Sequence, residues 1–160
     1  MTNEDFIEAV KRNNQRIYLI AFSFTKSKTD AEDILQNVFL KLWKFPNEFE
    51  NEIHLDKWLT AVCVNESKNY LKSPFRKKSM VYFEENVQSE LESTKNLDLF
   101  NAVMSLPKKE RAVIHLFYYE DMTVKEIAEV LKIKESAVKT RLHRARKSLK
   151  LILGDEWINE

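Results

Sequence analysis

Basic and short polar side chains gather near the C-terminus in a pattern that could bind a polyanion. From Lys139 to Lys150 there are six lysine and arginine side chains and no acid. Such cations bind phosphates through charge-assisted hydrogen bonds, whereas short polar groups like those of Ser136, Thr140 and His143 can reach base edges. The residue types therefore indicate contact with a nucleic acid. An ordinary solvated basic face is the alternative that this segment alone leaves open.

Two helices with a tight connector are expected to position these side chains. Thr123 and Glu126 have the spacing of a capping box, and they precede a helix with Ile127, Ala128 and Leu131 on one apolar side. The following helix carries a single apolar stripe formed by Val138, Leu142, Ala145 and Leu149. A supporting helix followed by a basic helix is typical of a DNA-binding helix-turn-helix.

Composition narrows the class of protein. The 160 residues are 44% hydrophobic with a formal net charge of +1, yet residues 132–150 hold eight basic side chains against one acid, Glu135. With Gly154 as the only glycine, phosphate-binding loops and glycine-dependent hairpins are not available, which favours an all-helical chain. Cys63 lies in an apolar run and is expected to be a buried thiol. His54, His115 and His143 lack metal-ligand spacing.

No triad, metal cluster or phosphate loop can be assembled, so we expect neither enzymatic activity nor a cofactor. The polar, acidic N-terminus is unlike a secretory signal, and no apolar run approaches the length of a membrane span. A cytoplasmic protein without membrane insertion is therefore expected.

The chain is predicted to be all-α, with two small helical domains at 1–73 and 97–153 joined by a linker at 74–96. The first domain should contain one long helix or two abutting helices at 4–26, followed by helices at 30–44 and 55–72. Thr29 and Glu32 are expected to form a second capping box, and Pro46 is expected to end the middle helix. A polar loop with an exposed Phe49 follows Pro46. In the second domain, Pro107 suits the first position of a helix that runs to about Tyr119.

One polar side of the 30–44 helix stands out. If Val38 is the centre of its core side, then Asp33, Gln36 and Leu40 project from the opposite side. An acid, an amide and an exposed leucine at this spacing make a docking strip for another protein. Taken alone, the same pattern fits an ordinary solvated face.

With both halves placed, the chain resembles an extracytoplasmic-function sigma factor of bacterial RNA polymerase. The resemblance covers nearly the whole chain, and four segments in family order carry it: DAEDILQNVFLKLWK at 30–44, DKWLTAVCVNESKNYLK at 56–72, LPKKERAVIHLFYYEDMTVKEIAEVLKI at 106–133 and SAVKTRLHRARKSLK at 136–150. It implies two helical domains, sigma regions 2 and 4. Their partners would be core RNA polymerase, through its clamp and flap, and promoter DNA, with an anti-sigma factor as a further candidate.

The resemblance also assigns roles to residues. In the first domain, Asp33, Gln36, Asn37 and Leu40 match the clamp-binding helix. Asn65 matches a position near the pocket for a flipped minus-ten base; Trp58, Lys68, Asn69 and Tyr70 lie in the same motif, and Phe49 lies in the base-capturing loop. Trp58 is equally a core candidate. In the second domain, Lys139, Thr140, His143 and Arg144 match positions that face the major groove at the minus-thirty-five element. Ser136, Arg141 and Lys147 complete the expected DNA-binding set, with Arg141, Arg146 and Lys147 contacting phosphate or bracing the helix.

The chain departs from the family pattern at the turn. Lys132 stands where members often have glycine, and Lys134 stands where they often have a small capping residue. We therefore expect Ser136 to cap the recognition helix one turn later. The Asn37 position is often acidic in the family.

Two further classes remain open from the sequence. A helix-turn-helix regulator would bind duplex DNA without polymerase, but it has no use for the strand-opening motif around Asn65. A helical adaptor that binds only proteins would show no salt-sensitive affinity for DNA.

Overall fold

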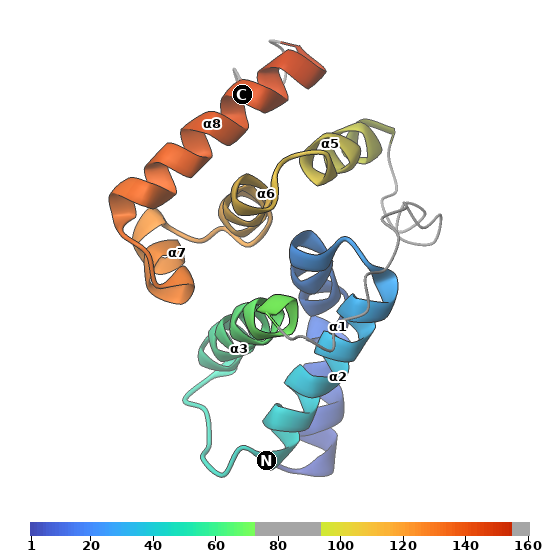
Figure 1. Ribbon diagram of the computed structural model, residues 1–160. Coiled ribbons are helices and arrows are strands. Elements are labelled where there is room, and N and C mark those ends of the chain that lie inside the picture. The colour runs from blue at the N-terminus through green and yellow to red at the C-terminus, as the bar shows by residue number, and fades with distance from the viewer. Residues whose placement is uncertain (73–93, 155–160) are drawn as a thin grey trace. The chain divides into compact units, whose positions relative to one another are not determined.

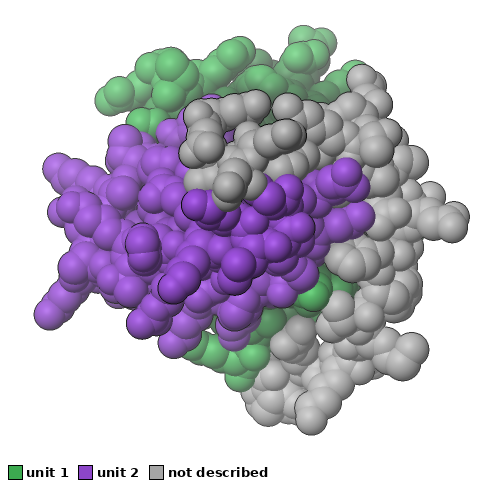
Figure 2. Space-filling model, turned by 90° about the horizontal axis from the view of Figure 1, so that it is seen from above, with its two compact units in different colours: residues 1–81 green, residues 82–160 purple. Residues whose placement is uncertain are grey.

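The computed structural model describes residues 1–72 and 94–154, and every regular element within those ranges is a helix (Figure 1). The all-α prediction is thus confirmed for the described chain. Two compact units divide the molecule at residue 81, and Figure 2 draws them in green and purple. The predicted linker lies outside the described residues, except that the first helix of the second unit begins at Thr94.

Three helices form the first unit: α1 (Asn3–Thr25), α2 (Lys28–Lys44) and α3 (Glu52–Lys72). Each packs against the other two. The apolar stripes meet in a core from which water is excluded, and its largest fully buried side chains are Ile17, Ile20, Phe22, Ile34, Leu42 and Leu59. Cys63 is buried among them as predicted, with its thiol 3.5 Å from the carbonyl oxygen of Ile17.

The turn between α1 and α2 is shorter than predicted. Lys26 adopts the left-handed conformation at φ 52° and ends α1, and Ser27 then caps α2 by accepting a hydrogen bond from the Asp30 amide at 3.2 Å. The predicted capping box of Thr29 and Glu32 is therefore wrong, because Thr29 already lies inside the helix. A Ser at the cap and an Asp in the first turn both favour a helix start here.

The second unit contains α5 (Thr94–Met104), α6 (Lys108–Ile114), the π-helical turn η1 (His115–Tyr119), α7 (Val124–Leu131) and α8 (Glu135–Leu153). Pro107 was predicted to be the first residue of this helix. It is instead the capping residue directly before α6. The predicted end near Tyr119 is correct, but the last five residues form the π-helical turn and not α-helix.

His115 lies in that π-helical turn and is almost fully buried. Its ring stacks on Tyr119 with 5.0 Å between centroids, and burial lowers its pKa to about 4. Within the described part of the chain, Nε2 of His115 is buried without a hydrogen-bond partner. The second unit thus carries a neutral histidine in its core at physiological pH.

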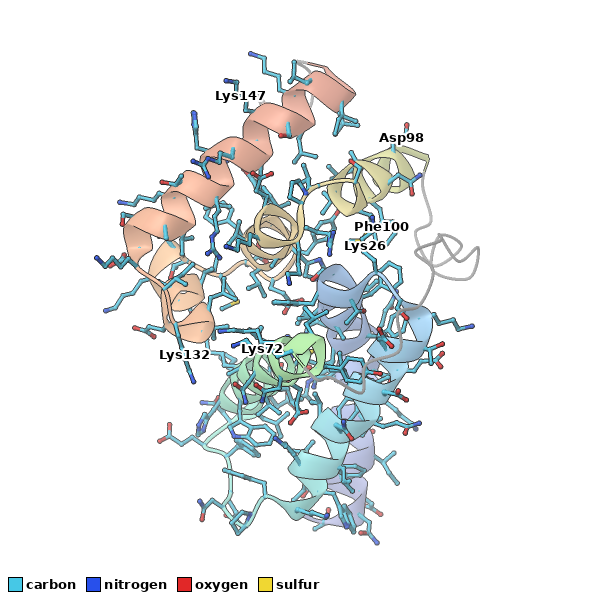
Figure 3. All side chains as sticks on the ribbon, viewed as in Figure 1. Lys26, Lys72, Asp98, Phe100, Lys132 and Lys147 are labelled. Atoms are coloured by element: carbon cyan, nitrogen blue, oxygen red, sulfur yellow. The ribbon has the colours of Figure 1, made fainter. Side chains whose placement is uncertain are left out.

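The capping box before α7 is confirmed. The Glu126 amide donates to the Thr123 hydroxyl at 3.1 Å, and the Thr123 amide donates to the Glu126 carboxylate at 3.0 Å. Lys132 ends α7 in the left-handed conformation at φ 59°, where glycine would be unstrained. Figure 3 shows Lys132 at this end of α7.

The start of the recognition helix differs from the prediction. α8 begins at Glu135 after Lys134, whose extended backbone takes the capping position without a side-chain hydrogen bond. Ser136 is already inside the first turn, where its carbonyl oxygen accepts from Thr140, so the predicted cap at Ser136 is wrong.

Candidate functional site

The basic helix α8 presents one continuous exposed face. Its predicted apolar stripe is buried against α6 and α7, which fixes the rotation of the helix about its axis. The residues predicted to meet DNA then lie on the open side, where Ser136, Lys139, Thr140, His143, Arg144 and Lys147 are all exposed. Figure 3 shows Lys147 projecting from α8. Arg141 is half-buried beside this face.

Two polar side chains of α8 have internal partners that limit what they can do. The Thr140 hydroxyl donates to the Ser136 carbonyl at 3.0 Å, so its oxygen is left to accept and its methyl group is left to make apolar contacts. Arg146 donates from Nε to the Tyr118 hydroxyl at 2.8 Å and lies over the Phe117 ring at 5.3 Å. Arg146 is therefore a brace between α8 and η1, one of the two roles expected for it.

The predicted docking strip on α2 is exposed. Asp33, Gln36 and Leu40 lie on the side of the helix opposite the buried Val38, and Leu40 is 50% exposed. Asn37 is exposed at the edge of this side. Trp43 continues the strip one turn further and is 54% exposed, with its ring 5.0 Å from that of Phe6. Trp43 was not among the predicted residues, although its i+3 spacing from Leu40 was a sufficient signal.

Tyr70 of α3 reaches this strip. Its hydroxyl lies 3.1 Å from the Asp30 carboxylate and 3.1 Å from the Asp33 carboxylate. Burial raises the pKa of Tyr70, and the hydrogen bonds to both carboxylates raise it further. Two turns further along α2, an ion pair between Lys41 and Glu66 also joins α2 to α3. The docking strip is thus held by the helix that carries the predicted strand-opening residues.

The loop before α3 is organised around aromatic rings. Phe49 stacks on Phe45 at 4.9 Å and meets Trp58 at 5.4 Å, while Phe45 lies 4.8 Å from Trp58. Phe49 is therefore half-buried, and the expectation of an exposed Phe49 is wrong. Trp58 is also half-buried, so it is partly packed in the core and partly open to a ligand, and both roles expected for it remain compatible with its position. Asn51 closes the loop by accepting from the His54 amide at 2.8 Å.

A hollow of about 440 Å³ opens beside this loop and the first turns of α1. Phe49, Asn47 and Asn51 line it from the loop, and Asp5 and Arg12 line it from α1. The hollow combines an aromatic wall with amides, which can stack on a base and hydrogen-bond to it. Its charged lining is mostly acidic, with Asp5, Glu48 and Glu52 against the single cation Arg12.

Asn65 lies apart from that hollow. It is exposed on α3 two helical turns beyond Trp58, a distance of about 10 Å along the axis. Asn69 follows one turn later and is also exposed, whereas Lys68 is half-buried. The structure therefore brings Phe49 and Trp58 together and places Asn65, Lys68 and Asn69 on the same helix as a second, polar group.

A polar network orients α3 against α1. Arg12 donates to the Asp56 carboxylate at 2.9 Å, which raises the pKa of Arg12, and the buried Asn13 donates to the same oxygen at 3.1 Å. Arg16 donates to the Thr60 hydroxyl at 2.6 Å and to the Asp56 carbonyl at 3.0 Å. These bonds fix the rotation of α3, so they set the direction of Trp58 and Asn65. No pattern in the sequence predicted this network.

Neither a membrane span nor a metal centre is found among the described residues. None of their helices is long and apolar enough to cross a membrane. No group of three or more His, Cys, Asp or Glu side chains among them could hold a metal ion.

Comparisons with known proteins agree on one family. The family model for sigma-70 region 2 matches residues 9–76, and the model for sigma-70 region 4 matches residues 97–149. The RNA polymerase sigma factor SigV of Bacillus subtilis is 29% identical over 154 residues, which cover 94% of this chain and 92% of SigV. The ECF RNA polymerase sigma factor SigW of the same organism is 25% identical over 174 residues, which cover 94% of this chain and 89% of SigW.

A solved structure shares the fold. The sigma factor RpoE of Bartonella quintana, in complex with the anti-sigma factor NepR, aligns with a TM-score of 0.68. The alignment covers 94% of this chain and 97% of RpoE at 21% sequence identity.

Proposed function

We propose how the two units of this chain share the work of promoter-specific initiation. The chain belongs to the sigma-70 family as an extracytoplasmic-function sigma factor. As a sigma factor it binds core RNA polymerase and promoter DNA. We assign residues 1–73 to region 2, residues 97–153 to region 4 and residues 74–96 to the connection between them. The observation that supports this function is that the models for both regions match this chain in family order. Each region presents an exposed polar face, on α2 in region 2 and on α8 in region 4.

Region 2 binds the polymerase clamp through the α2 strip. An exposed leucine, Leu40, surrounded by the polar Asp33, Gln36 and Asn37 suits the centre of an interface, where apolar contact supplies energy and polar groups supply orientation. Trp43 extends the contact, because its half-exposed ring is the type of side chain that dominates binding energy at interfaces.

Region 2 also opens the minus-ten element. The hollow beside Phe49 would hold a base pulled out of the duplex, and Trp58 supports its aromatic wall. Asn65 and Asn69 contact the separated strand along α3 through amides that both donate and accept, and Lys68 supplies positive charge for its backbone.

Region 4 reads the minus-thirty-five element as duplex. Lys139, Thr140, His143 and Arg144 face the major groove, with Ser136, Arg141 and Lys147 at its edges. Polymerase contact through the flap completes the role of this unit. An anti-sigma factor is a further partner of the assembly, and the protein works in the cytoplasm at the nucleoid, without catalytic activity of its own.

Run-off transcription tests this function against that of a helix-turn-helix regulator. Purified chain is added to core polymerase on genomic fragments, and discrete start sites are expected. The variant Gln36→Arg with Leu40→Asp should lose co-purification with core polymerase and all run-off products while keeping its helicity and its binding to duplex. A chain that binds duplex but never supports initiation would be a regulator and not a sigma factor.

A further inference from the structure

His54 ties the loop between α2 and α3 to the first turn of α3 (Figure 1). Its ring nitrogen Nδ1 accepts a hydrogen bond from the Glu50 amide at 3.2 Å, and its own amide donates to the Asn51 side chain at 2.8 Å. Asn51 directly precedes α3 and caps it, and the side chain three residues later reaches back to the loop. These two bonds resemble a capping box in which histidine takes the place usually held by Glu or Gln.

The same histidine packs against the ring of Phe49. The two ring centroids lie 5.3 Å apart in an edge-to-face arrangement. Phe45 and Trp58 contact Phe49 as well, so three rings hold it in place. Phe49 and Asn51 line the hollow beside the loop, and His54 contacts both of them. His54 is thus placed to support the wall of the hollow.

The bond from the Glu50 amide exists only while Nδ1 of His54 carries no proton. A neutral imidazole with its proton on Nε2 accepts at Nδ1, whereas an imidazolium donates from both nitrogens. A proton on Nδ1 would therefore turn two donors toward each other and break the bond. It would also place a positive charge in the first turn of α3, where the helix dipole disfavours it. His54 is exposed, so solvent reaches its ring directly.

Other charged groups near this end of α3 belong to the loop, to α1 and to α3 itself. Most of them are acidic, and the set consists of Glu48, Glu50, Glu52, Asp5, Arg12 and Lys57. Histidine is the type of side chain whose charge ordinarily changes between about pH 5 and about pH 8. A substitution of His54 leaves all six of these groups in place, so it isolates the effect of the ring.

We propose that His54 is a positioning residue for the captured minus-ten base, and that its neutral ring holds Phe49 in place. This inference rests on the proposed capture of a base in the hollow beside Phe49. While the Glu50 amide is bonded, two hydrogen bonds fix the loop to α3, and Phe49 presents a rigid surface for stacking. Protonation of His54 releases one of the two bonds. Base capture therefore weakens as the pH falls through the range in which histidine takes up a proton.

The contribution of the captured base to binding tests the proposal. Holoenzyme is reconstituted with the full chain, and its affinity is measured for a pre-melted template from a promoter that it transcribes in run-off assays. The same template is then given single abasic sites across the minus-ten region. The captured base is the position at which an abasic site costs affinity in the wild type but not in Phe49→Ala.

At that position the abasic loss of the wild type should be about threefold larger at about pH 8 than at about pH 6, as expected for one hydrogen bond of ordinary strength. Because each loss is a ratio of two affinities at one pH, a general effect of pH on polymerase cancels.

Three variants separate the acceptor from the proton. His54→Asn keeps an acceptor oxygen near the place of Nδ1 and takes up no proton, so at both pH values its loss should equal that of the wild type at about pH 8. His54→Leu removes the acceptor and should show the smaller loss at both. Glu50→Gln changes the side chain but keeps the amide that donates, and it should keep the pH dependence of the wild type.

The outcomes distinguish this inference from the function beneath it. If no abasic loss depends on Phe49, base capture in the hollow is wrong, and the role of His54 is overturned with it. If such a position exists but His54→Leu keeps the full loss at about pH 8, only the positioning role is overturned. A pH dependence that persists in His54→Asn would overturn it as well, because another group would then take up the proton.

Discussion

The hydroxyl of Tyr70 on α3 lies 3.1 Å from the carboxylate of Asp33 on α2, and this contact joins the helix of the docking strip to the helix that carries Asn65. Asp30, which is buried, accepts from the same hydroxyl at the same distance. A single proton is thus shared between a buried and an exposed carboxylate. The exposed one belongs to the strip proposed to bind polymerase, so Tyr70 holds that carboxylate in place.

Tyr70→Phe should weaken polymerase binding without removing it. The substitution keeps the ring but releases Asp33 and leaves Asp30 without this donor, and loss of a hydrogen bond to a charged group costs about 1.5–3 kcal/mol. We expect part of that cost in the stability of the first unit and a severalfold loss of affinity for core polymerase. Equilibrium competition for core polymerase and thermal unfolding measure the two effects.

A double-mutant cycle isolates the positioning role. If Tyr70 acts through Asp33, then Tyr70→Phe should have little further effect on affinity in an Asp33→Ala background, where the acceptor is missing. Fully additive losses would show that Tyr70 supports binding by another route.

Asn65→Ala should impair strand opening while leaving polymerase binding and upstream duplex binding nearly intact. Its exposed amide can both donate and accept, as contact with a base edge requires. A template already melted across the minus-ten region should bypass part of the defect, because the cost of unpairing has been met. Permanganate footprinting on closed and pre-melted templates measures the effect, with Asn14→Ala, an exposed asparagine of α1, as the control. Normal opening by the Asn65 variant would remove this residue from the minus-ten site.

Arg144→Ala should flatten the preference for the upstream element. Arg144 is exposed at the centre of the α8 face, and a bidentate contact between arginine and a base contributes about 1–3 kcal/mol of discrimination. A binding selection from a random library should yield a weaker consensus with this variant than with Lys150→Ala, which lies near the end of the helix. Equal losses of affinity on specific and random duplexes would show that Arg144 contacts only phosphate.

Lys132→Gly should stabilise the second unit. Lys132 holds a left-handed backbone at φ 59°, a conformation that costs an L-residue about 1 kcal/mol and costs glycine almost nothing. The matched substitution Lys125→Gly lies inside α7 and should instead destabilise by about 1 kcal/mol. Denaturant unfolding of the two variants should therefore show shifts of opposite sign, and a loss of stability in both would contradict this account of the turn.

The stability of the second unit should fall as the pH drops below about 6.5. Burial lowers the pKa of His115 to about 4, so between that value and the ordinary histidine pKa the unfolded chain binds the proton and the folded chain does not. The stability carried by the neutral ring is complete above the unfolded pKa and is lost as the pH falls to the folded pKa. Across the whole range between the two pKa values, the free energy of unfolding should fall by about 3 kcal/mol. A pH midway between the two values should show about half of this loss.

Denaturant unfolding at about pH 7 and about pH 5 measures this dependence. His115→Leu should reduce the difference between the two conditions, whereas His143→Leu, at an exposed position on α8, should keep it. An unchanged pH dependence in the His115 variant would assign the effect to other groups.

Helices and their exposed faces could be predicted because the signals are local. A helical period repeats within four residues, and the Thr123–Glu126 capping box needs only the two side chains and the two amides that it joins. The buried stripe from Val138 to Leu149 likewise determined which side of α8 remains open. For the same reason the strip from Asp33 to Leu40 was placed correctly, and Trp43 could have been added to it.

Other features depended on residues that are distant in the sequence, and only the tertiary structure decided them. Phe49 is half-buried because Phe45 and Trp58 close around it, and α2 begins at Lys28 because α1 ends in a tight left-handed turn at Lys26. The contact of Tyr70 with Asp33 spans 37 residues, and that of Arg12 with Asp56 spans 44. The sequence by itself determined the helices, the two regions and the family. The packing of those helices determined which polar side chains meet, since hydrogen bonds and ring contacts form only between groups that the folded chain brings within a few ångströms.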